Sequence, residues 1–406
     1  MATERICVLG LGYIGLPTAS ILATHGFDVV GVDKRKAVID HLRQGRTPIE
    51  EPGLNTLVEA ALKSNHLSLN DEVQEADVFM ICVPTPHENA RADLSFVREA
   101  AQSIARRLKP GNLVILESTV PPSTVEKILI PILAGSGQKI PGDVFVAHCP
   151  ERVLPGNILT ELVTNDRIVG GIDELSRERA KAVYGRFVQG EIHLTDCTTA
   201  ETVKLIENTF RDVNIAFANE VEAVCRKIGI NAWDVIRLAN KHPRVNILRP
   251  GPGVGGHCIA VDPWFLVEAA PEEAKMTRLA REINDAKPLR VIAEIEQTLK
   301  NTGKAKPALL CLGATYKANV DDIRESPALH IIEHFSKRRD LTFMVADAHA
   351  KNLNHNIPSV ALNEGLSKAD VIALLVDHKE FLSLDWPGLR SRKGAENILD
   401  FKGVMP

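Results

Sequence analysis

The 406-residue sequence lacks the features that mark membrane, secreted and zinc-bound proteins. It has no apolar run near the roughly 18 residues of a membrane-spanning helix, and its first residues show no basic segment followed by the apolar stretch of a secretion signal. Its seven cysteines form no C-x-x-C pair, which argues against a disulfide framework and against a zinc site. We therefore expect a cytoplasmic protein with no metal site.

A dominant charge of one sign is also missing. The formal net charge is −4, so no basic field favours nucleic acid or a membrane surface as a partner. Low-complexity tracts, which would indicate disorder, are absent as well. A chain of this length is expected to form roughly two to three domains. Any anionic ligand must be bound by local groups.

Short apolar runs, typical of buried parallel strands, alternate with helical segments at both ends of the chain. The runs are RICVLG, FDVVGVD, ADVFMICV, NLVILES and DVFVAHC, and later PALLCLG, LTFMVAD and ADVIALLV. A long helical stretch between them starts near residue 199 and ends at Gly229. Similar runs in the two halves hint at an internal duplication. The pattern predicts an α/β protein with two Rossmann-like doubly wound domains, 1–198 and 303–406, joined by a helical central region, 199–302.

A glycine-rich turn follows the first predicted strand and precedes an apolar helix. Such a turn allows close approach of a pyrophosphate, and the helix N-terminus receives the phosphate charge. Asp33 ends the next strand, where its carboxylate can accept hydrogen bonds from ribose hydroxyls and repel a 2′-phosphate. This favours NAD over NADP, although Lys34 and Arg35 could hold a 2′-phosphate instead. The candidate cofactor residues of the turn are Gly10, Gly12, Tyr13, Ile14 and Gly15.

A second glycine-rich segment, GPGVGGHC, ends in Cys258 and is followed by Asp262. Its backbone amides can approach a ligand or a developing oxyanion, which would support a nucleophile at Cys258. Oxidation of an alcohol to an acid needs two hydride transfers, and a thiolate can hold the aldehyde between them as a thiohemiacetal and then as a thioester. Taken alone, the cysteine is equally compatible with inert packing. The neighbouring His257 is expected to have no chemical role.

Other polar side chains lie where a ligand could meet them. Lys204 and Asn208 are four residues apart in the long helix and therefore share a face, although most such lysines are solvated. Thr119 follows the run NLVIL, and Glu151 and Arg152 follow DVFVAH. Strand ends of this kind form the ligand-binding edge of an α/β sheet.

Taken together, these motifs resemble the UDP-glucose/GDP-mannose dehydrogenase family, whose signature is a G-x-G-G-x-C loop followed by an aspartate. The resemblance spans nearly the whole chain and includes the later segment KANVDDIRESP. It implies a two-step, NAD-dependent oxidation of the C6 alcohol of a UDP-sugar by a homodimer. Five apolar positions of the long helix, more than one small domain needs to bury, suit a dimer core: Val203, Ile206, Phe210, Val213 and Phe217.

The resemblance also implies residue roles. Cys258 would be the nucleophile and Asp262 its orienting or activating partner. Lys204 would stabilise oxyanions, and Asn208 would donate a second hydrogen bond to the same oxygen. Thr119 would position a water, and the base that assists hydrolysis of the thioester is expected to be Glu151.

Further candidates lie in the loops. The family places a lysine near the nucleotide sugar and an arginine near the active site or NAD, which here are Lys317 and Arg324, while Ser326 and Pro327 also suit a helix N-terminus. Arg244 could reach a diphosphate or a neighbouring subunit's substrate. The candidate substrate-binding residues are Glu151, Arg152, Lys204, Asn208, Arg244, Gly253, Gly255 and Lys317, and the further cofactor candidates are Thr85, Thr119 and Arg324.

Several activities remain open at this point. Pro155 replaces a glutamate of the glucose-oxidising members, and the segments PERVLPG and GPGVGGHCIAVDPWF are most similar to the branch that acts on UDP-N-acetyl-D-mannosamine. UDP-N-acetylglucosamine and UDP-glucose are the alternative substrates. A one-step dehydrogenase of the hydroxyacid type would not need Cys258, and a non-catalytic nucleotide-binding protein would produce no NADH.

Overall fold

A computed structural model describes residues 4–256, 258–350, 353–354 and 356–405, so His257 lies outside the described residues. The chain divides into two compact units. The first comprises residues 1–207 with 268–270, and the second residues 208–267 with 271–406. None of the described helices is both long enough and apolar enough to cross a membrane.

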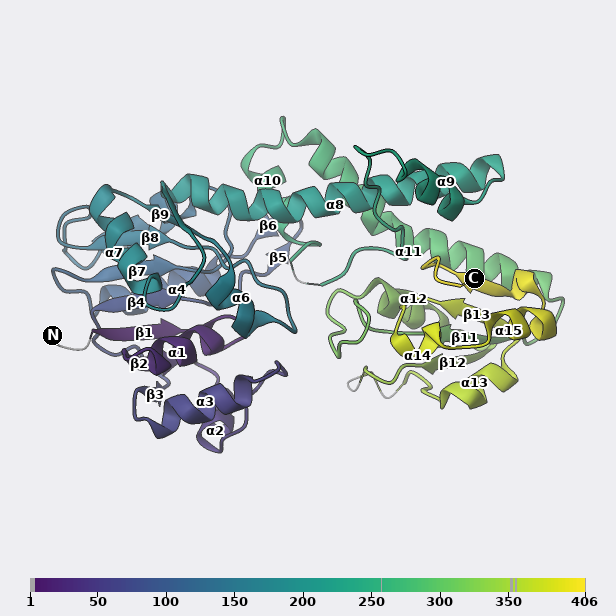
Figure 1. Cartoon of the computed structure of the whole chain (residues 1–406), viewed down its shortest axis with the longest axis horizontal. Helices are drawn as coiled ribbons and strands as arrows, with labels where there is room; N and C mark the ends of the chain where they lie inside the picture. The colour runs from purple at the N-terminus through teal and green to yellow at the C-terminus, as the bar shows by residue number, and fades with distance from the viewer. Residues whose placement is uncertain (1–3, 257, 351–352, 355, 406) are drawn as a thin grey trace. The chain divides into compact units, whose positions relative to one another are not determined.

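The first unit is built on an eight-stranded sheet with the order β10-β9-β8-β7-β4-β1-β2-β3 (Figure 1). All neighbouring pairs are parallel except β8 and β9. The chain starts at β1 and extends the sheet in both directions from it, so the topological switch lies between β1 and β4, where open α/β sheets bind ligands. The bounds are β1 Arg5–Leu9, β2 Asp28–Val32, β3 Leu67–Asn70, β4 Val78–Ile81, β7 Leu113–Leu116, β8 Phe145–His148, β9 Arg167–Gly171 and β10 Ile192–Thr195.

Helices cover both faces of this sheet. Alternate residues of β1 enter two different hydrophobic clusters, Ile6 and Val8 on one face and Cys7 and Leu9 on the other. A small antiparallel ribbon, β5 (His87–Glu88) with β6 (Arg91–Ala92), follows β4. The helices are α1 Gly15–Thr24, α2 Lys36–Arg43, α3 Leu54–Lys63, α4 Ser95–Ala105, η1 Val125–Leu129, α5 Ile130–Ala134, α6 Ile158–Thr164 and α7 Glu174–Tyr184.

The long predicted helix is confirmed as α8, Cys197–Ile228, which contributes residues to both units. It ends at Gly229, whose φ of 79° lies in the left-handed region that glycine adopts without strain. Three more helices belong to the central region: α9 Ala232–Ala239, α10 Asp262–Ala269 and α11 Lys275–Asn301.

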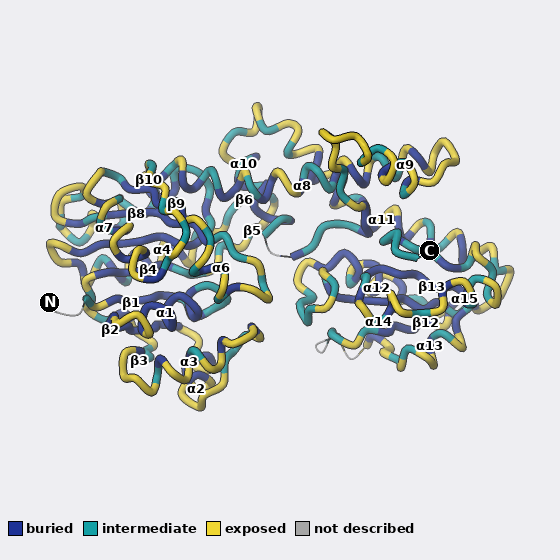
Figure 2. Tube along the Cα trace, viewed as in Figure 1, coloured by how far each residue is buried: buried dark blue, intermediate teal, exposed yellow. Residues whose placement is uncertain are grey.

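The second unit contains a four-stranded parallel sheet with the order β12-β11-β13-β14. As in the first sheet, the central strands are buried, and exposure is concentrated in the loops, the edge strands and the outer faces of helices (Figure 2). The two predicted Rossmann-like domains and the helical region that joins them are thus confirmed. The bounds are β11 Ala308–Leu312, α12 Pro327–Ser336, β12 Thr342–Ala346, α13 Leu362–Lys368, β13 Val371–Leu374, α14 Lys379–Leu382, α15 Trp386–Lys393, η2 Ala395–Asn397 and β14 Ile398–Asp400.

The hydrogen bonds of the two sheets support an internal duplication. In the first, the N–H of Gly10 donates to the carbonyl of Val32 at 2.7 Å, and in the second the N–H of Gly313 donates to Ala346 at 3.0 Å. Both glycines have positive φ, 95° and 90°. The turn after the first strand of each domain is therefore built in the same way.

Candidate active site

Glycine is required at different positions of the first turn for different structural reasons. A Cβ on Gly10 would lie 2.7 Å from the carbonyl oxygen of Cys82, and one on Gly15 would overlap the carbonyl of Gly10. Both therefore permit close packing of the turn against its own domain. A Cβ on Gly12 would meet no described heavy atom within 4 Å, so its backbone is open to a ligand at the N-terminus of α1. This arrangement fits the pyrophosphate of a dinucleotide.

Asp33 lies at the end of β2 with its carboxylate anchored. Oδ2 accepts a hydrogen bond from the N–H of Leu11 at 3.1 Å, and Oδ1 accepts one from the N–H of Arg35 at 2.9 Å. Burial alone would raise the pKa of Asp33, but hydrogen bonds from Arg35 and Leu11 outweigh it and hold this pKa below its usual value. The side chain of Arg35 also pairs with Asp33, and Lys34 pairs with Glu99. Both nearby cations are thus engaged with carboxylates, which favours NAD over a cofactor with a 2′-phosphate.

Two predicted threonines follow neighbouring strands of the same sheet. Thr85 lies beyond β4 and Thr119 beyond β7, and these strands are paired, so the two residues share the carboxyl edge. Thr119 is half-exposed. Within the described part of the chain, the Thr85 hydroxyl is buried without a hydrogen-bond partner. A buried hydroxyl of this kind fits a ligand group. Tyr13 and Ile14, in the glycine turn, are half-buried.

Glu151 follows β8 and is 7% exposed. Its Oε1 accepts a hydrogen bond from the N–H of Arg152 at 2.6 Å, and its Oε2 lies 2.8 Å from Nη1 of the buried Arg167. The side chain of Arg152, a predicted substrate ligand, pairs with Glu207 at 2.5 Å. Sequence reasoning missed Arg167, which begins β9 and has no local motif around it.

Lys204 is only 8% exposed, yet its ammonium forms no ion pair or hydrogen bond that can be identified among the described residues. Most of the Lys204 side chain is therefore covered by protein, unlike the exposed lysine typical of a helix surface. Such a group is suited to meet the negative charge of a ligand or of a reacting oxygen.

In the second unit, the structure brings three predicted residues together. The carbonyl of Cys258 accepts hydrogen bonds from the N–H groups of Val261 (3.0 Å) and Asp262 (2.8 Å), so the cysteine loop turns directly into α10. Asp262 is buried, and its Oδ2 accepts a hydrogen bond from Nδ2 of Asn208 at 2.5 Å. Asn208, expected to hydrogen-bond the reacting oxygen, thus also anchors the cysteine loop to α8. All seven cysteines are thiols rather than disulfides.

The glycines before Cys258 pack closely against another segment of the second unit. A Cβ on Gly255 would lie 2.8 Å from both Tyr316 and Pro327, and a Cβ on Gly256 would lie 2.9 Å from the ring of Tyr316. A Cβ on Gly253 would also meet Pro327 at 2.8 Å. These glycines therefore serve close packing between the cysteine loop and residues 316–327, in addition to the ligand contacts predicted for Gly253 and Gly255.

The charged residues of these loops lie at the surface. Lys317 is exposed, as is Arg324, which pairs with Asp322 at 2.6 Å. The predicted helix N-terminus is confirmed, because Ser326 accepts a hydrogen bond from the N–H of Leu329 at the start of α12. Arg244 is exposed in the loop after α9.

A carboxylate that the sequence analysis missed occupies the place of Asp33 in the second sheet. Asp347 follows β12, and its Oδ2 accepts the N–H of Ala314 at 2.6 Å while its Oδ1 accepts the N–H of His349 at 2.7 Å. The two bonds match those that Asp33 receives from Leu11 and Arg35. The internal duplication was the signal that could have identified this residue.

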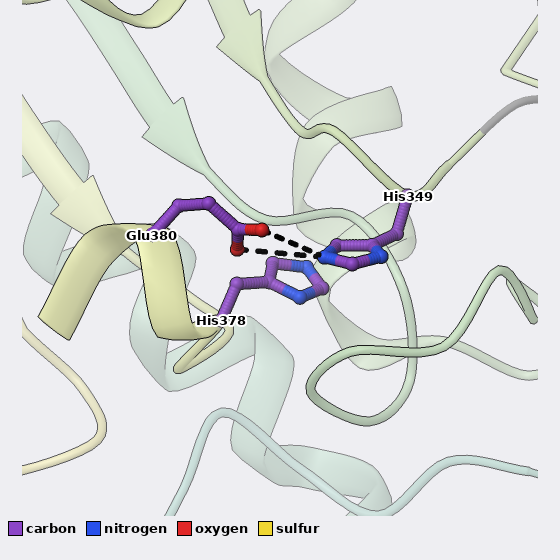
Figure 3. Close-up of side chains that lie close together, drawn as sticks. All are labelled: His349, His378 and Glu380. Atoms are coloured by element: carbon purple, nitrogen blue, oxygen red, sulfur yellow. Dashed lines mark hydrogen bonds and ion pairs between the residues drawn. The ribbon is translucent and has the colours of Figure 1, made fainter. Parts of the chain in front are cut away.

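Asp347 belongs to a cluster with His378, His349 and Glu380, of which Figure 3 draws the last three. His349 faces Glu380 at 3.4 Å and stacks on His378, with ring centroids 4.6 Å apart. Nδ1 of the buried His378 accepts the N–H of Asn319 at 2.9 Å, and Nε2 lies 3.1 Å from Asp347. Both ring nitrogens of His378 are therefore engaged. The cluster supports the loop that carries Lys317.

These features define the class of the protein. A dinucleotide turn with an ordered ribose-type carboxylate, together with a glycine-packed cysteine loop and a second Rossmann-like domain, is the structure of an NAD-dependent dehydrogenase that acts on a nucleotide-linked substrate.

Comparison with protein families identifies the family within this class. The chain matches the UDP-glucose/GDP-mannose dehydrogenase family in its NAD binding domain (residues 4–188), its central domain (198–286) and its UDP binding domain (310–406). The chain therefore belongs to this family, and it is an NAD-dependent oxidoreductase.

Relatives and solved structures agree with this assignment. A UDP-N-acetyl-D-mannosamine dehydrogenase of Methanococcus maripaludis is 50% identical over 94% of this chain and 88% of its own length. An NDP-N-acetyl-D-galactosaminuronic acid dehydrogenase of Ralstonia nicotianae is 48% identical over 99% and 96%. The structure of UDP-D-ManNAc dehydrogenase from Pyrococcus horikoshii, 39% identical, superposes with a TM-score of 0.90 over 99% of this chain and 96% of that one.

Proposed function

We propose that the protein oxidises the C6 alcohol of UDP-N-acetyl-D-mannosamine to UDP-N-acetyl-D-mannosaminuronate in two NAD-dependent steps. The observation that carries the two-step reaction is the anchoring of the Cys258 loop, because Asp262 is buried and bonded to Asn208 of α8. A one-step dehydrogenase has no use for a thiol held in this way. The choice of sugar is supported by relatives such as the Methanococcus enzyme.

The chain's own groups account for the chemistry. Bound NAD supplies the hydride acceptor for each oxidation. Cys258 adds to the C6 aldehyde and holds it as a thiohemiacetal and then as a thioester, so the aldehyde does not escape. The ammonium of Lys204 and the amide of Asn208 stabilise the negative oxygen on this carbon. Thr119 positions a water, and Glu151 takes its proton in the final hydrolysis.

The proposal includes a cytoplasmic homodimer and the domain division 1–198, 199–302 and 303–406. A stripe of large apolar side chains runs along α8 at helical spacing and is more than half exposed, Phe210 most of all at 68%. An exposed apolar stripe of this size on one helix is typical of a surface that a second subunit covers. Its members are Ile206, Phe210, Phe217, Val224 and Ile228.

A galacto-configured substrate is the second candidate, because the Ralstonia relative named for N-acetyl-D-galactosaminuronic acid is nearly as similar to this chain. Both candidates carry an acetamido group at C2. A pocket with a hydrogen-bond partner for that group loses roughly 1–3 kcal/mol when the partner is left unpaired by a hydroxyl-bearing sugar. UDP-glucose should therefore be used at least ~10-fold less efficiently in kcat/KM than the preferred acetamido sugar.

The test is a panel of UDP-N-acetylmannosamine, UDP-N-acetylgalactosamine, UDP-N-acetylglucosamine and UDP-glucose, assayed by NADH formation with equal enzyme. We expect UDP-N-acetylmannosamine to give the highest kcat/KM and two NADH per molecule consumed. One NADH per molecule would refute the two-step reaction, and none would indicate a binding protein. Preference for UDP-glucose would refute the choice of sugar alone.

A further inference from the structure

Arg167 is a buried cation that forms a short ion pair with Glu151. It is the first residue of β9, 3% exposed, and its Nη1 lies 2.8 Å from Oε2 of Glu151. The strand β9 lies next to β8, which leads directly to Glu151, so two adjacent strands set the separation of the pair. The position of the carboxylate is therefore tied to the sheet.

The guanidinium itself is held on several sides. It lies over the ring of Tyr184, 5.1 Å from its centroid, and 6.0 Å from the ring centroid of Phe187. Its Nη2 donates to the carbonyl of Leu162 at 3.4 Å. Aromatic faces and a carbonyl leave Arg167 little freedom to follow Glu151 if that carboxylate moves. The immobile guanidinium of Arg167 therefore holds the carboxylate of Glu151 in one position.

A second buried carboxylate, Glu117, is satisfied without the cation. The hydroxyl of Tyr184 donates to its Oε1 at 2.7 Å, and the thiol of Cys82 donates to its Oε2 at 3.1 Å. Burial raises the pKa of Glu117, which favours its neutral form, and the nearby Glu151 raises it further against the opposing effect of Arg167. The charge of Arg167 thus acts on both carboxylates, and its short ion pair is with Glu151.

The ion pair leaves Glu151 able to accept a proton. Among the described residues, its Oε2 is buried 2.8 Å from Nη1 of Arg167, whereas its Oε1 accepts one hydrogen bond, from the N–H of Arg152, and keeps a second lone pair. An oriented carboxylate with an unused lone pair on Oε1 is suited to act as a general base.

From these contacts we infer that Arg167 is the positioning residue that fixes Glu151 for hydrolysis of the Cys258 thioester. This inference rests on the proposed two-step function. Water adds its oxygen to the thioester carbon and passes a proton to Glu151. The tetrahedral intermediate then collapses, the C–S bond breaks, and the sugar acid and the Cys258 thiolate are released. Arg167 touches neither the substrate nor the water.

The experiment compares Arg167→Met, Arg167→Lys, Glu151→Gln and the double variant Arg167→Met with Glu151→Gln. The covalent sugar adduct on Cys258 is measured by intact-protein mass spectrometry after quenching at steady state, together with the rate of acid release. We expect Glu151→Gln and Arg167→Met each to slow hydrolysis by roughly 100-fold and to accumulate the adduct. Arg167→Lys, which keeps the charge but loses the planar fork, should recover part of the rate.

The double variant separates positioning from general destabilisation. If Arg167 acts through Glu151, the double variant hydrolyses the thioester no more slowly than Glu151→Gln alone. Lys287→Met is the matched control, since Lys287 is a buried cation paired with Glu222 elsewhere in the chain. This control should lower thermal stability as Arg167→Met does, without adduct accumulation.

The outcomes distinguish the two levels of the proposal. Adduct in Glu151→Gln but none in Arg167→Met, or additive losses in the double variant, would overturn the role of Arg167 and leave the proposed function intact. Should Arg167→Met fail to fold, full hydrolysis in Arg167→Lys would likewise count against a positioning role for the fork. Absence of any Cys258 adduct in Glu151→Gln, despite NADH formation, would remove the assigned hydrolysis step and the inference with it.

Discussion

Replacing Gly255 by alanine adds only one methyl group, but we expect it to displace the cysteine loop. The added Cβ would lie 2.6 Å from the carbonyl oxygen of Glu325 and 2.8 Å from both Tyr316 and Pro327. Two of these three atoms belong to a backbone carbonyl and a proline ring, so rotation of a flexible side chain cannot relieve the contact. The loop that carries Cys258 must move instead.

The size of the effect follows from these distances. Ordinary contact begins near 3.4 Å, so the two segments must separate by about 0.6–0.8 Å. Overpacking of this kind costs roughly 1–3 kcal/mol, which corresponds to a Tm lower by roughly 2–12 °C for a unit of this size. A displacement approaching 1 Å at a reacting group reduces the rate by up to about 100-fold.

The assay compares Gly255→Ala with Gly251→Ala, a control in the same loop. Within 4 Å, a Cβ on Gly251 would meet only Nζ of Lys402 among the described residues, at 3.8 Å, so this variant should keep native stability and rate. Both variants are measured for kcat/KM by NADH formation and for Tm by calorimetry. Equal behaviour of the two variants would show that close packing against residues 316–327 does not set the position of Cys258.

Three further perturbations test separate parts of the structure. Cys258→Ser should nearly abolish acid formation while leaving NAD binding, measured by titration, unchanged, because it removes the thioester alone; full acid production would contradict the covalent route. Asp33→Ala should weaken the binding of NAD and reduce the preference for NAD over NADP, both measured by the same titration. An unchanged ratio of the two affinities would show that another residue discriminates between the cofactors. Burial lowers the pKa of His148 to about 3, and neither ring nitrogen has a hydrogen-bond partner among the described residues. His148 is therefore neutral in the folded protein but is protonated below about pH 6.5 in the unfolded chain. The free energy of unfolding should consequently fall by about 1.4 kcal/mol per pH unit as the pH decreases from 6.5 toward 3. Urea unfolding at pH 7.5 and 5.0 should show a smaller loss of this free energy in His148→Leu than in the native protein, and an equal loss would assign the acid sensitivity to other groups.

The central strands could be predicted from the sequence because they are buried on both faces and read as continuous apolar runs. Apart from the two-residue strands β5 and β6, the strands that were missed are of two kinds. β3, β10 and β14 lie at sheet edges, and no residue of β10 (IHLT) is buried. β9 begins with the buried Arg167 and ends in two glycines, so its composition does not indicate a strand.

The parts of the site that could be predicted are short motifs, such as the glycine turn and the cysteine loop. Contacts between distant segments could not be predicted, because one sequence carries no information on which buried charges meet. The pair of Arg167 with Glu151 and the bond from Asn319 to His378 are of this kind. Likewise, the glycines before Cys258 were expected to serve ligands, and their packing against Tyr316 became evident only in three dimensions.

The duplicated aspartates have a consequence for how two nucleotides share one enzyme. Asp33 and Asp347 receive equivalent backbone hydrogen bonds, but the side chain of Asp347 is fully buried beside His378. That carboxylate has become part of the scaffold and cannot receive a ribose, which is the role predicted for Asp33. The second Rossmann-like domain therefore has no free carboxylate in the place of Asp33 to bind the ribose of NAD. A higher NAD concentration should thus not inhibit the enzyme by competition with its UDP-sugar.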